Sequence, residues 1–546
     1  MRALALWAAA IVAALPAGAA AQSPHERLHR LADEAHARAL DRFAYEDALA
    51  GERRARKRHR DLLARLAAIP TGGLGETDRV THRLLEWQSR SALERLEPPF
   101  TEHMLLVPLE GGLAADLVRL MTRDSFADER EARAWMKRLA RYPALLAAAR
   151  GRLAASIERE TTTPRVLVER SLEQWERLAA PGAREGPLWA PAERFAGPVR
   201  AEYERLLDVE VLPAMREFAR FVREDYLPRA RASDGLGAIP GGERLYRALV
   251  RQETAAGFTP DAIHQLGLSE VKRIQLQVML AAGQAGYKGE LRDLRTWLRT
   301  DPANFPFRNA GEVLARLHAI QSGLAPRLPL LFARLPRAAY EIGLEDVFGE
   351  QPPADAAEVS RVMLPAMVAR EGMPGRALER SLARERGLPA YRRELRFDAY
   401  DQGWALYAEG LGHALGLYDE PVELVGRYLD ELHRAALLVV DTGLHARGWE
   451  RGRAIEFMVE EGALPERGAT EAVLRCMAWP ARALAGKAGE IALRDLRSAA
   501  QRRLGNAFDL RAFHESVLDQ GQLPLDVLRW RMEPAVSPRS KAPAAR

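Results

Sequence analysis

The sequence has few of the features that mark several large classes of protein. Its 546 residues include a single cysteine, Cys476, so no intramolecular disulfide can form and the fold depends on its core. After residue 21, no apolar run approaches the ~18 residues that a transmembrane anchor requires. No stripe of basic residues with interleaved aromatic side chains is present either. We therefore expect no transmembrane anchor and no nucleic-acid partner.

The common catalytic and nucleotide-binding motifs are missing as well. The chain contains no HExxH, no GxSxG and no Walker loop, and residues 410–416 do not match GxGxxG. The histidines His264, His413 and His433 are isolated from one another, and a lone histidine is more often structural than a metal ligand. Serine-hydrolase and nucleotide-binding functions are therefore unsupported.

What the sequence does contain indicates a helical globular protein. It is 47% hydrophobic and 28% charged with a net charge of +5, and its acidic and basic residues are interleaved, which is typical of solvated helix faces. Apolar residues recur every three or four positions, the spacing of one buried helical face. An example is the set Val425, Leu429, Leu432, Ala436 and Val439. The fold class is therefore predicted to be all-α.

Length and chain breaks predict the domain organisation. A chain of 546 residues exceeds the ~250–300 residues at which single cores stop growing, so two lobes are expected. The glycine-rich stretch 235–242 is the predicted loop between an N-terminal helical lobe, 24–234, and a larger lobe, 243–533. Residues 534–546 are rich in Pro, Ser, Ala and basic residues and form a predicted disordered tail.

The first 21 residues have the pattern of a secretory signal peptide. Arg2 precedes an apolar run over residues 3–15, and Ala19, Ala20 and Ala21 provide the small residues of a cleavage site. No cysteine follows the apolar run, so lipid attachment at that point is not expected. The mature protein is therefore predicted to be exported, either periplasmic or secreted after cleavage near Ala21.

One segment bears most directly on function. Residues 370–376 read Arg-Glu-Gly-Met-Pro-Gly-Arg and resemble the HExxPGH motif of the DUF885 family of zinc metallopeptidases, with Glu371, Pro374 and Gly375 in place. Both histidines of the motif are replaced, by Arg370 and by Arg376. The segment thus resembles a metallopeptidase site from which the metal ligands have been removed.

Two further segments carry the same resemblance. Residues 402–409 are similar to the family segment EGWALYAE, but Gln402 replaces the glutamate that supplies the third ligand. Residues 479–487 resemble WPGQALSYK, with departures at Arg482 and Gly486. The likeness covers nearly the whole mature chain, residues 24–533, and is most specific at residues 438–449. It implies a large, two-lobed helical metallopeptidase-like fold with a central cleft.

The three substitutions remove the implied metal site. Zinc is held by lone pairs of neutral imidazole, carboxylate or thiolate. A guanidinium stays protonated and has no lone pair to offer, and Gln402 has only a neutral carbonyl oxygen. We therefore expect no metal and no cofactor at these positions. We predict instead that Arg370 or Arg376 pairs with Glu371, Glu409 or another acidic side chain of the cleft.

The resemblance also suggests roles for individual residues. Glu371 matches the general base of an active relative, a role that is vestigial without the metal. Asp441 and His445 are four residues apart and would share one helical face. They either orient an imidazole for proton transfer or form a buried, hydrogen-bonded structural pair. The expected residues of the ligand cleft are Glu409, Tyr407 and Arg482.

Three functions stay open at this point. The first is a non-catalytic pseudoenzyme that binds a peptide or another carboxylate-bearing ligand in the old cleft. The second is a metal-independent hydrolase that uses Glu371, Asp441 and His445. The third is a structural partner of an active paralogue. The sequence favours the first, because all three implied ligand positions are lost together.

The N-terminal pattern can be tested directly. We expect the intact mass of protein purified from its export compartment to correspond to a chain that begins at or near Gln22, because cleavage follows the small residues that end at Ala21. A measured mass that still includes Met1 would contradict the predicted export.

Overall fold

The described structure consists of helices and the loops that join them. The structure is a computed structural model that describes residues 23–39, 52–96, 105–107, 112–121, 126, 128–179, 182–195, 197–349 and 353–535. Within these ranges there is no strand, and an isolated bridge pairs Pro164 with Arg231. The prediction of an all-α fold is confirmed. The predicted signal peptide, 1–21, and residues 536–546 of the predicted tail lie outside the described residues.

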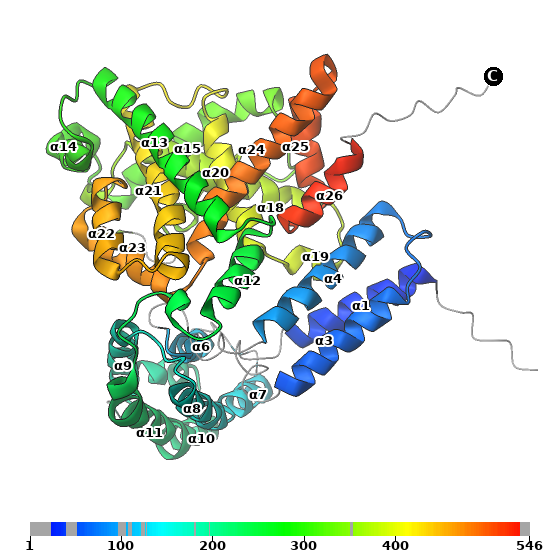
Figure 1. Cartoon of the computed structure of the whole chain (residues 1–546), viewed down its shortest axis with the longest axis vertical. Helices are drawn as coiled ribbons and strands as arrows, with labels where there is room; N and C mark the ends of the chain where they lie inside the picture. The colour runs from blue at the N-terminus through cyan, green and yellow to red at the C-terminus, as the bar shows by residue number, and fades with distance from the viewer. Residues whose placement is uncertain are drawn as a thin grey trace, which may run out of the picture.

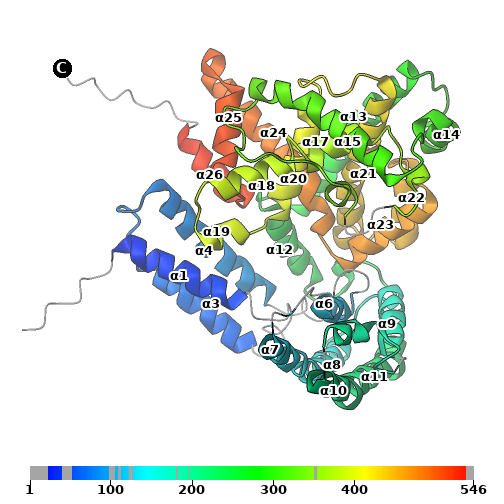
Figure 2. The ribbon, with the colours of Figure 1, turned by 180° about the vertical axis from the view of Figure 1, so that it is seen from behind.

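The chain begins with three helices that lie side by side, α1 (Pro24–Ala39), α3 (Glu52–Ala67) and α4 (Glu76–Arg95). Figures 1 and 2 show them as one layer beside the larger C-terminal part. Buried leucines of this layer, including Leu28 and Leu84, belong to the same hydrophobic core as Leu317 and Trp404 of the C-terminal part. The layer is therefore packed against the C-terminal helices through apolar side chains.

A second group of helices has a core of its own. Its buried side chains, which include Trp175 and Tyr203, all come from residues 105–230. Figure 1 shows this group at the end of the molecule away from α25. Its members are α6 (Gly112–Met121), α7 (Glu129–Leu139), α8 (Tyr142–Glu158), α9 (Arg165–Ala179), α10 (Gly197–Leu206) and α11 (Leu212–Phe221).

The remaining helices form the C-terminal part and contain every motif singled out in the sequence. They are α12 (Gly242–Thr254), α13 (Pro260–Gln284), α14 (Leu294–Thr300), α15 (Ala310–Leu324), α16 (Leu344–Phe348), α17 (Leu364–Glu371), α18 (Arg376–Glu385), α19 (Ala390–Glu394), α20 (Asp398–Leu411), α21 (Pro421–Ala446), α22 (Arg451–Glu460), α23 (Glu466–Ala478), α24 (Ala485–Leu504), α25 (Leu510–Leu518) and α26 (Leu525–Ala535). The division into lobes 24–234 and 243–533 stays a prediction. The shared hydrophobic core joins α1, α3 and α4 to the helices of the predicted lobe 243–533.

Helix α21 lies inside the C-terminal part. Val425, Leu429, Leu432, Ala436 and Val439 are fully buried, as their spacing predicts. Polar residues of α21 are buried too, so the helix is surrounded by protein over most of its length. It packs along α13 and also contacts α17, α22, α23 and α24.

Helices α20 and α24 cross at a pair of glycines. A Cβ atom on Gly403 would lie 2.6 Å from the backbone carbon of Gly489, and one on Gly489 would lie 1.9 Å from the carbonyl oxygen of Ala399. Only glycine lets the two backbones approach this closely. Substitution at either position would push α20, and with it residues 402–409, away from α24.

A buried lysine joins three helices of this part. The ammonium of Lys487 on α24 lies 2.9 Å from Glu270 of α13, 2.8 Å from Glu431 of α21 and 2.9 Å from Glu490. Burial alone would lower the pKa of Lys487, but the three glutamates outweigh it and raise the pKa above its usual value. The lysine is therefore charged and neutralises carboxylates that would otherwise repel one another.

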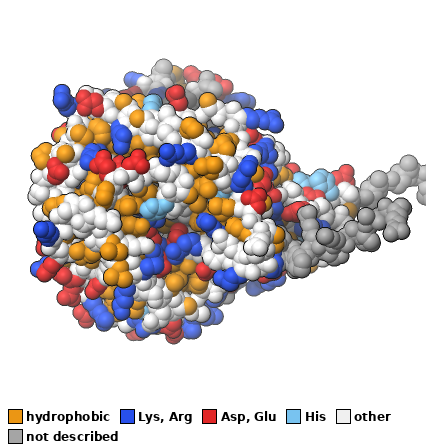
Figure 3. All heavy atoms as spheres, turned by 90° about the horizontal axis from the view of Figure 1, so that it is seen from above, with side chains coloured by type: hydrophobic (Ala, Val, Ile, Leu, Met, Phe, Trp, Pro, Cys, Tyr) orange, Lys and Arg blue, Asp and Glu red, His pale blue; other side chains and the backbone are white. Residues whose placement is uncertain are grey.

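The surface carries mixed charge. Acidic and basic side chains are interspersed over the face that Figure 3 shows, as the interleaved sequence predicts. No helix in the described part of the chain is both long and apolar enough to span a membrane.

The lysine cluster gives a test of the fold. Lys487→Ala should lower the free energy of unfolding at pH 7 by about 3–5 kcal/mol, because it removes a fully buried cation that contacts three carboxylates, although Arg273, Arg427 and Arg494 still pair with them. Urea denaturation followed by circular dichroism measures the loss. The matched control is Lys272→Ala, since Lys272 is an exposed lysine on α13. Equal losses in the two variants would show that the buried cluster does not hold the three helices together.

Candidate functional site

The segment that resembles a metal motif forms the end of one helix, a tight turn and the start of the next. Arg370 and Glu371 end α17, and Arg376 begins α18. A Cβ atom on Gly375 would lie 2.0 Å from the carbonyl oxygen of Arg370, so this turn requires glycine. The indole of Trp404 on α20 donates hydrogen bonds to the carbonyl oxygens of Pro374 and Gly375, at 3.2 Å each.

Arg370 is buried among carboxylates from three helices. Its guanidinium lies 3.1 Å from Glu371, 3.1 Å from Glu409 of α20 and 2.6 Å from Asp430 of α21. Only 12% of its side chain is exposed. Burial acts to lower the pKa of Arg370, but the neighbouring carboxylates, Asp430 foremost, raise it above its usual value. The group is therefore a permanent cation that joins α17, α20 and α21.

Arg376 pairs with the same glutamate. It donates to both carboxylate oxygens of Glu371, and its Nε lies 2.7 Å from Asp401 of α20. Both oxygens of Glu371 are thus engaged by guanidinium groups. The prediction that Arg370 or Arg376 pairs with Glu371, Glu409 or another acidic side chain is confirmed for both arginines.

Two of the carboxylates in this cluster were not predicted. Asp430 lies on α21 and also pairs with Arg434, at 3.0 Å. Burial acts to raise the pKa of Asp430, but Arg434 and Arg370 outweigh it and lower the pKa. Asp430 and Arg434 are four positions apart, which is the spacing of an ion pair on a helix. This spacing could have indicated their pairing from the sequence. Asp401 precedes Gln402, and nothing in its sequence surroundings distinguishes it from a surface aspartate.

The donor set at the former ligand positions does not fit a zinc ion. Arg370 and Arg376 are protonated donors that are engaged with carboxylates, and Glu371 accepts hydrogen bonds from both. A metal ion there would have to displace two guanidiniums from their ion pairs and would find no imidazole or thiolate in exchange. Within this cluster the positive charge that balances the carboxylates comes from the two guanidiniums.

Gln402 lies beside a cavity of about 450 Å³. The cavity is bounded by α20, α21, α23 and the segment that follows α23, and its polar and aromatic lining residues are Gln402, His433, Glu471, Arg475, Trp479 and Arg482. Half of the Arg482 side chain is exposed, and its guanidinium carbon lies 5.1 Å from the centroid of the Trp479 ring. A hollow thus remains next to the third former ligand position.

His433 borders this cavity and a neighbouring one of about 410 Å³. Burial lowers the pKa of His433 to about 4, so its imidazole is neutral at pH 7. Its Nδ1 atom is buried without a hydrogen-bond partner in the described structure. The sequence alone does not single out this histidine, because it belongs to no recognised ligand motif although Asp430 and Glu431 stand close to it.

Asp441 and His445 are both fully buried in α21 and bond to other groups rather than to each other. Asp441 accepts hydrogen bonds from the Tyr246 hydroxyl at 2.5 Å and from the backbone N–H of Ala481 at 3.0 Å. Burial raises the pKa of Asp441 to about 7, although these hydrogen bonds act in the opposite sense.

The bonds of His445 are equally complete. The backbone N–H of Leu236 donates to its Nδ1 at 3.1 Å, so the proton resides on Nε2, which donates to the carbonyl of Cys476 at 3.0 Å. Both nitrogens therefore bond to the backbone. This arrangement fits the structural alternative for the Asp441 and His445 pair, since neither side chain offers an exposed atom to a substrate. Neither is among the partners of Arg370 or Arg376.

Of the predicted cleft residues, Arg482 borders the cavity beside Gln402, whereas Tyr407 and Glu409 do not. Tyr407 is five positions after Gln402 and points to the opposite side of α20, where its hydroxyl contacts His514 at 2.9 Å. Glu409 is on the same side as Gln402 but two turns further along, and Arg370 covers it. Helical periodicity explains both placements.

Comparisons with known proteins agree with the motifs. Among solved structures, a candidate lipoprotein from Colwellia psychrerythraea is similar with a TM-score of 0.82 and 24% identity, over 94% of this chain and 100% of that chain. A candidate lipoprotein of unknown function from Shewanella oneidensis is similar with a TM-score of 0.74 and 17% identity, over the same shares of the two chains. Both show the same fold.

A comparison with curated proteins finds no match. The profile of DUF885, a family described as bacterial proteins of unknown function, matches residues 41–532. Since that range includes the 370–376 and 402–409 segments and most of the chain, this protein belongs to the DUF885 family.

Proposed function

We propose that this protein is an exported, non-catalytic relative of zinc metallopeptidases that binds a peptide or another carboxylate-bearing ligand in the cavity beside Gln402. The observation that carries the proposal is the pairing of Arg370 and Arg376 with Glu371, next to a cavity that is still open. The N-terminal signal-peptide pattern supports export.

Loss of catalysis follows from the state of Glu371. A general base needs a free carboxylate within reach of the water that it activates. Both oxygens of Glu371 accept hydrogen bonds from guanidinium donors, so its carboxylate is engaged in ion pairs rather than free to contact a water. Without a metal, the attacking water also keeps a pKa close to that of bulk water. Glu371 therefore serves as the counterion of two arginines.

Ligand binding is supported by the charges around the cavity. Its lining includes two guanidiniums, Arg475 and Arg482, and one carboxylate, Glu471, which already pairs with Arg170 at 3.2 Å. Guanidinium groups hold carboxylates through paired hydrogen bonds. The amide of Gln402 can bond to a peptide backbone, and the Trp479 ring offers an apolar surface. The lining of the cavity therefore suits a ligand in which a small anionic group is attached to a peptide-like structure.

The other two functions have less support. A metal-independent hydrolase would need Glu371, Asp441 and His445 to meet at one substrate, yet Asp441 and His445 are fully buried and bonded elsewhere. A structural partnership with an active paralogue has no specific surface in its favour. The metal-independent hydrolase remains an outcome of the peptide experiment below.

The proposed ligand class can be tested with a pool of random hexapeptides offered in two forms, with a free or an amidated C-terminus. In the presence of EDTA, we expect the free-carboxylate pool to be retained by the protein and to stay uncleaved, as measured by mass spectrometry. Arg482→Ala should weaken retention at least tenfold, a change of about 1.4 kcal/mol. The control is Arg502→Ala, an exposed arginine on α24.

Each other result of the peptide experiment has a clear meaning. Cleavage of the pool in EDTA would favour the metal-independent hydrolase. Equal retention by the Arg482→Ala and Arg502→Ala variants, or no retention at all, would overturn the proposed binding site.

The ion pairs of the former metal site give a separate prediction. Arg376→Ala should lower the free energy of unfolding by about 3–5 kcal/mol, because it removes the partner that Glu371 shares with Asp401 in a mostly buried cluster. Arg502→Ala should change it by less than about 0.5 kcal/mol, as exposed substitutions usually do. Chemical denaturation of both variants measures the difference. Similar losses of unfolding free energy in the Arg376→Ala and Arg502→Ala variants would mean that the arginine at the histidine position of the motif does not stabilise the fold.

A further inference from the structure

We propose that His25, His29 and Asp78 form a binding site for one divalent transition-metal ion, with zinc as the expected occupant. The site lies on the N-terminal helices and shares no residue with the arginine cluster or with the cavity beside Gln402. It would connect α1 to α4.

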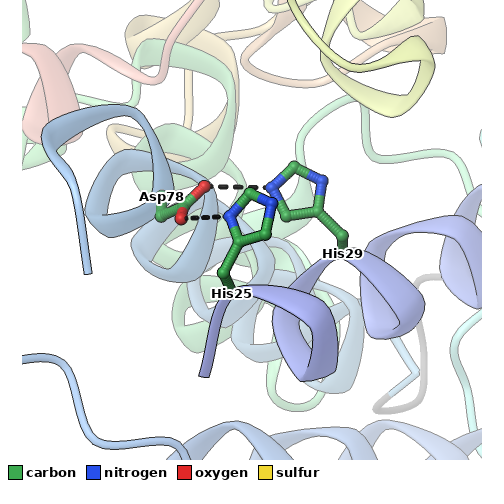
Figure 4. Close-up of side chains that lie close together, drawn as sticks. All are labelled: His25, His29 and Asp78. Carbon is green, nitrogen blue, oxygen red and sulfur yellow. Dashed lines mark hydrogen bonds and ion pairs between the residues drawn. The ribbon is translucent and has the colours of Figure 1, made fainter. Parts of the chain in front are cut away.

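The first observation is the convergence of two imidazoles on one carboxylate. His25 and His29 are four positions apart on α1, and their ring centroids are 4.2 Å apart. Nδ1 of His25 lies 2.7 Å from one oxygen of Asp78, and Nε2 of His29 lies 3.0 Å from the other. Figure 4 shows both rings turned toward Asp78, which projects from the first turn of α4.

The distances suit a metal ion with only small movements of the side chains. One ligand atom from each residue can be chosen so that all three lie within 4.8 Å of one another. Zinc binds imidazole nitrogen and carboxylate oxygen at ~2.0–2.2 Å, so tetrahedral ligand atoms are separated by roughly 3.3 Å. Widening the present contacts by a few tenths of an ångström would admit the ion between the three groups.

The ligand types favour a transition metal over calcium or magnesium. Imidazole suits zinc, copper and nickel, whereas calcium and magnesium prefer sets made of oxygen alone. Two nitrogens and one carboxylate leave a fourth position for water or an added ligand. The His25 side chain is 61% exposed, so an ion can enter from solvent.

The backbone that carries the three ligands is held by other contacts. Leu28 and Leu31 of α1 are buried in the shared core, at 0% and 3% exposure, and so is Leu84 of α4. The two helices thus stay in register without relying on the pairing of the histidines with Asp78. A site on a preformed frame loses little conformational freedom on binding. A bound ion would further stabilise the attachment of α1.

Zinc titration of the untagged, EDTA-stripped mature protein tests the site, with affinity read by competition against a chromophoric chelator. We expect about one ion per chain, bound more than tenfold more weakly by the His25→Ala/His29→Ala double variant. Asp78→Asn should also weaken binding while keeping the size of the side chain. His413→Ala is the control, since His413 is an exposed histidine outside the site. Thermal unfolding should shift upward with zinc in the parent protein and in the control only.

A cobalt titration adds a spectroscopic reading of the same site. Cobalt bound by the parent protein should give visible absorption that the double variant lacks, and circular dichroism without metal verifies that the variants fold. Zinc affinity that is unchanged in the double variant, or no binding by the parent protein, overturns this site. If Gln402→Ala abolished zinc binding instead, zinc would bind beside Gln402, and the proposal that this position is metal-free would be wrong. The proposed function and the proposed zinc site can therefore fail separately.

Discussion

Neutralisation of buried charge is the constraint on which the C-terminal part depends. Helices α17, α20 and α21 place Glu371, Glu409, Asp401 and Asp430 around the guanidiniums of Arg370 and Arg376 in a mostly buried region. Buried carboxylates repel one another and lose their hydration, which raises the free energy of the folded state. Nearby cations offset this cost. Arg370 and Arg376 supply two positive charges, the formal charge of the dication that the motif implies. The same requirement is met around Lys487, where its ammonium contacts three glutamates from α13, α21 and α24 that also pair with Arg273, Arg427 and Arg494.

This constraint explains why so much of the motif persists without ligands. Gly375 is required by the close carbonyl of Arg370, and Trp404 bonds to the turn that contains it. Gly403 permits the crossing of α20 and α24. These residues set the positions of the helices that place Arg370 and Arg376 among their carboxylates. Their presence therefore reports a fold and carries no information about catalysis.

The sequence was informative wherever a feature is local or fixed by periodicity. The spacing of Val425 and Val439 predicts a buried helix, and the charge of Arg370 and Arg376 predicts acidic partners. Local patterns do not indicate which residues far apart in the chain become partners. Asp430 follows Arg370 by 60 positions, and Asp78 follows His25 by 53. For Asp441 and His445, the shared helical face left a joint or a structural role open, and tertiary contacts with Tyr246 and Leu236 give each residue separate partners.

The arrangement also determines where a ligand can bind. A ligand carboxylate that approached Arg370 or Arg376 would have to displace Glu371, Glu409 or Asp401, each already in short contact, and would gain one ion pair while breaking another. Arg482 differs, because its side chain is half exposed and its contact with Asp398 is longer, at 3.5 Å. An exposed guanidinium can exchange its partner at little cost in free energy, because surface ion pairs contribute little to stability. Recognition is therefore expected at Arg482, in the cavity beside Gln402, rather than at the buried arginine cluster.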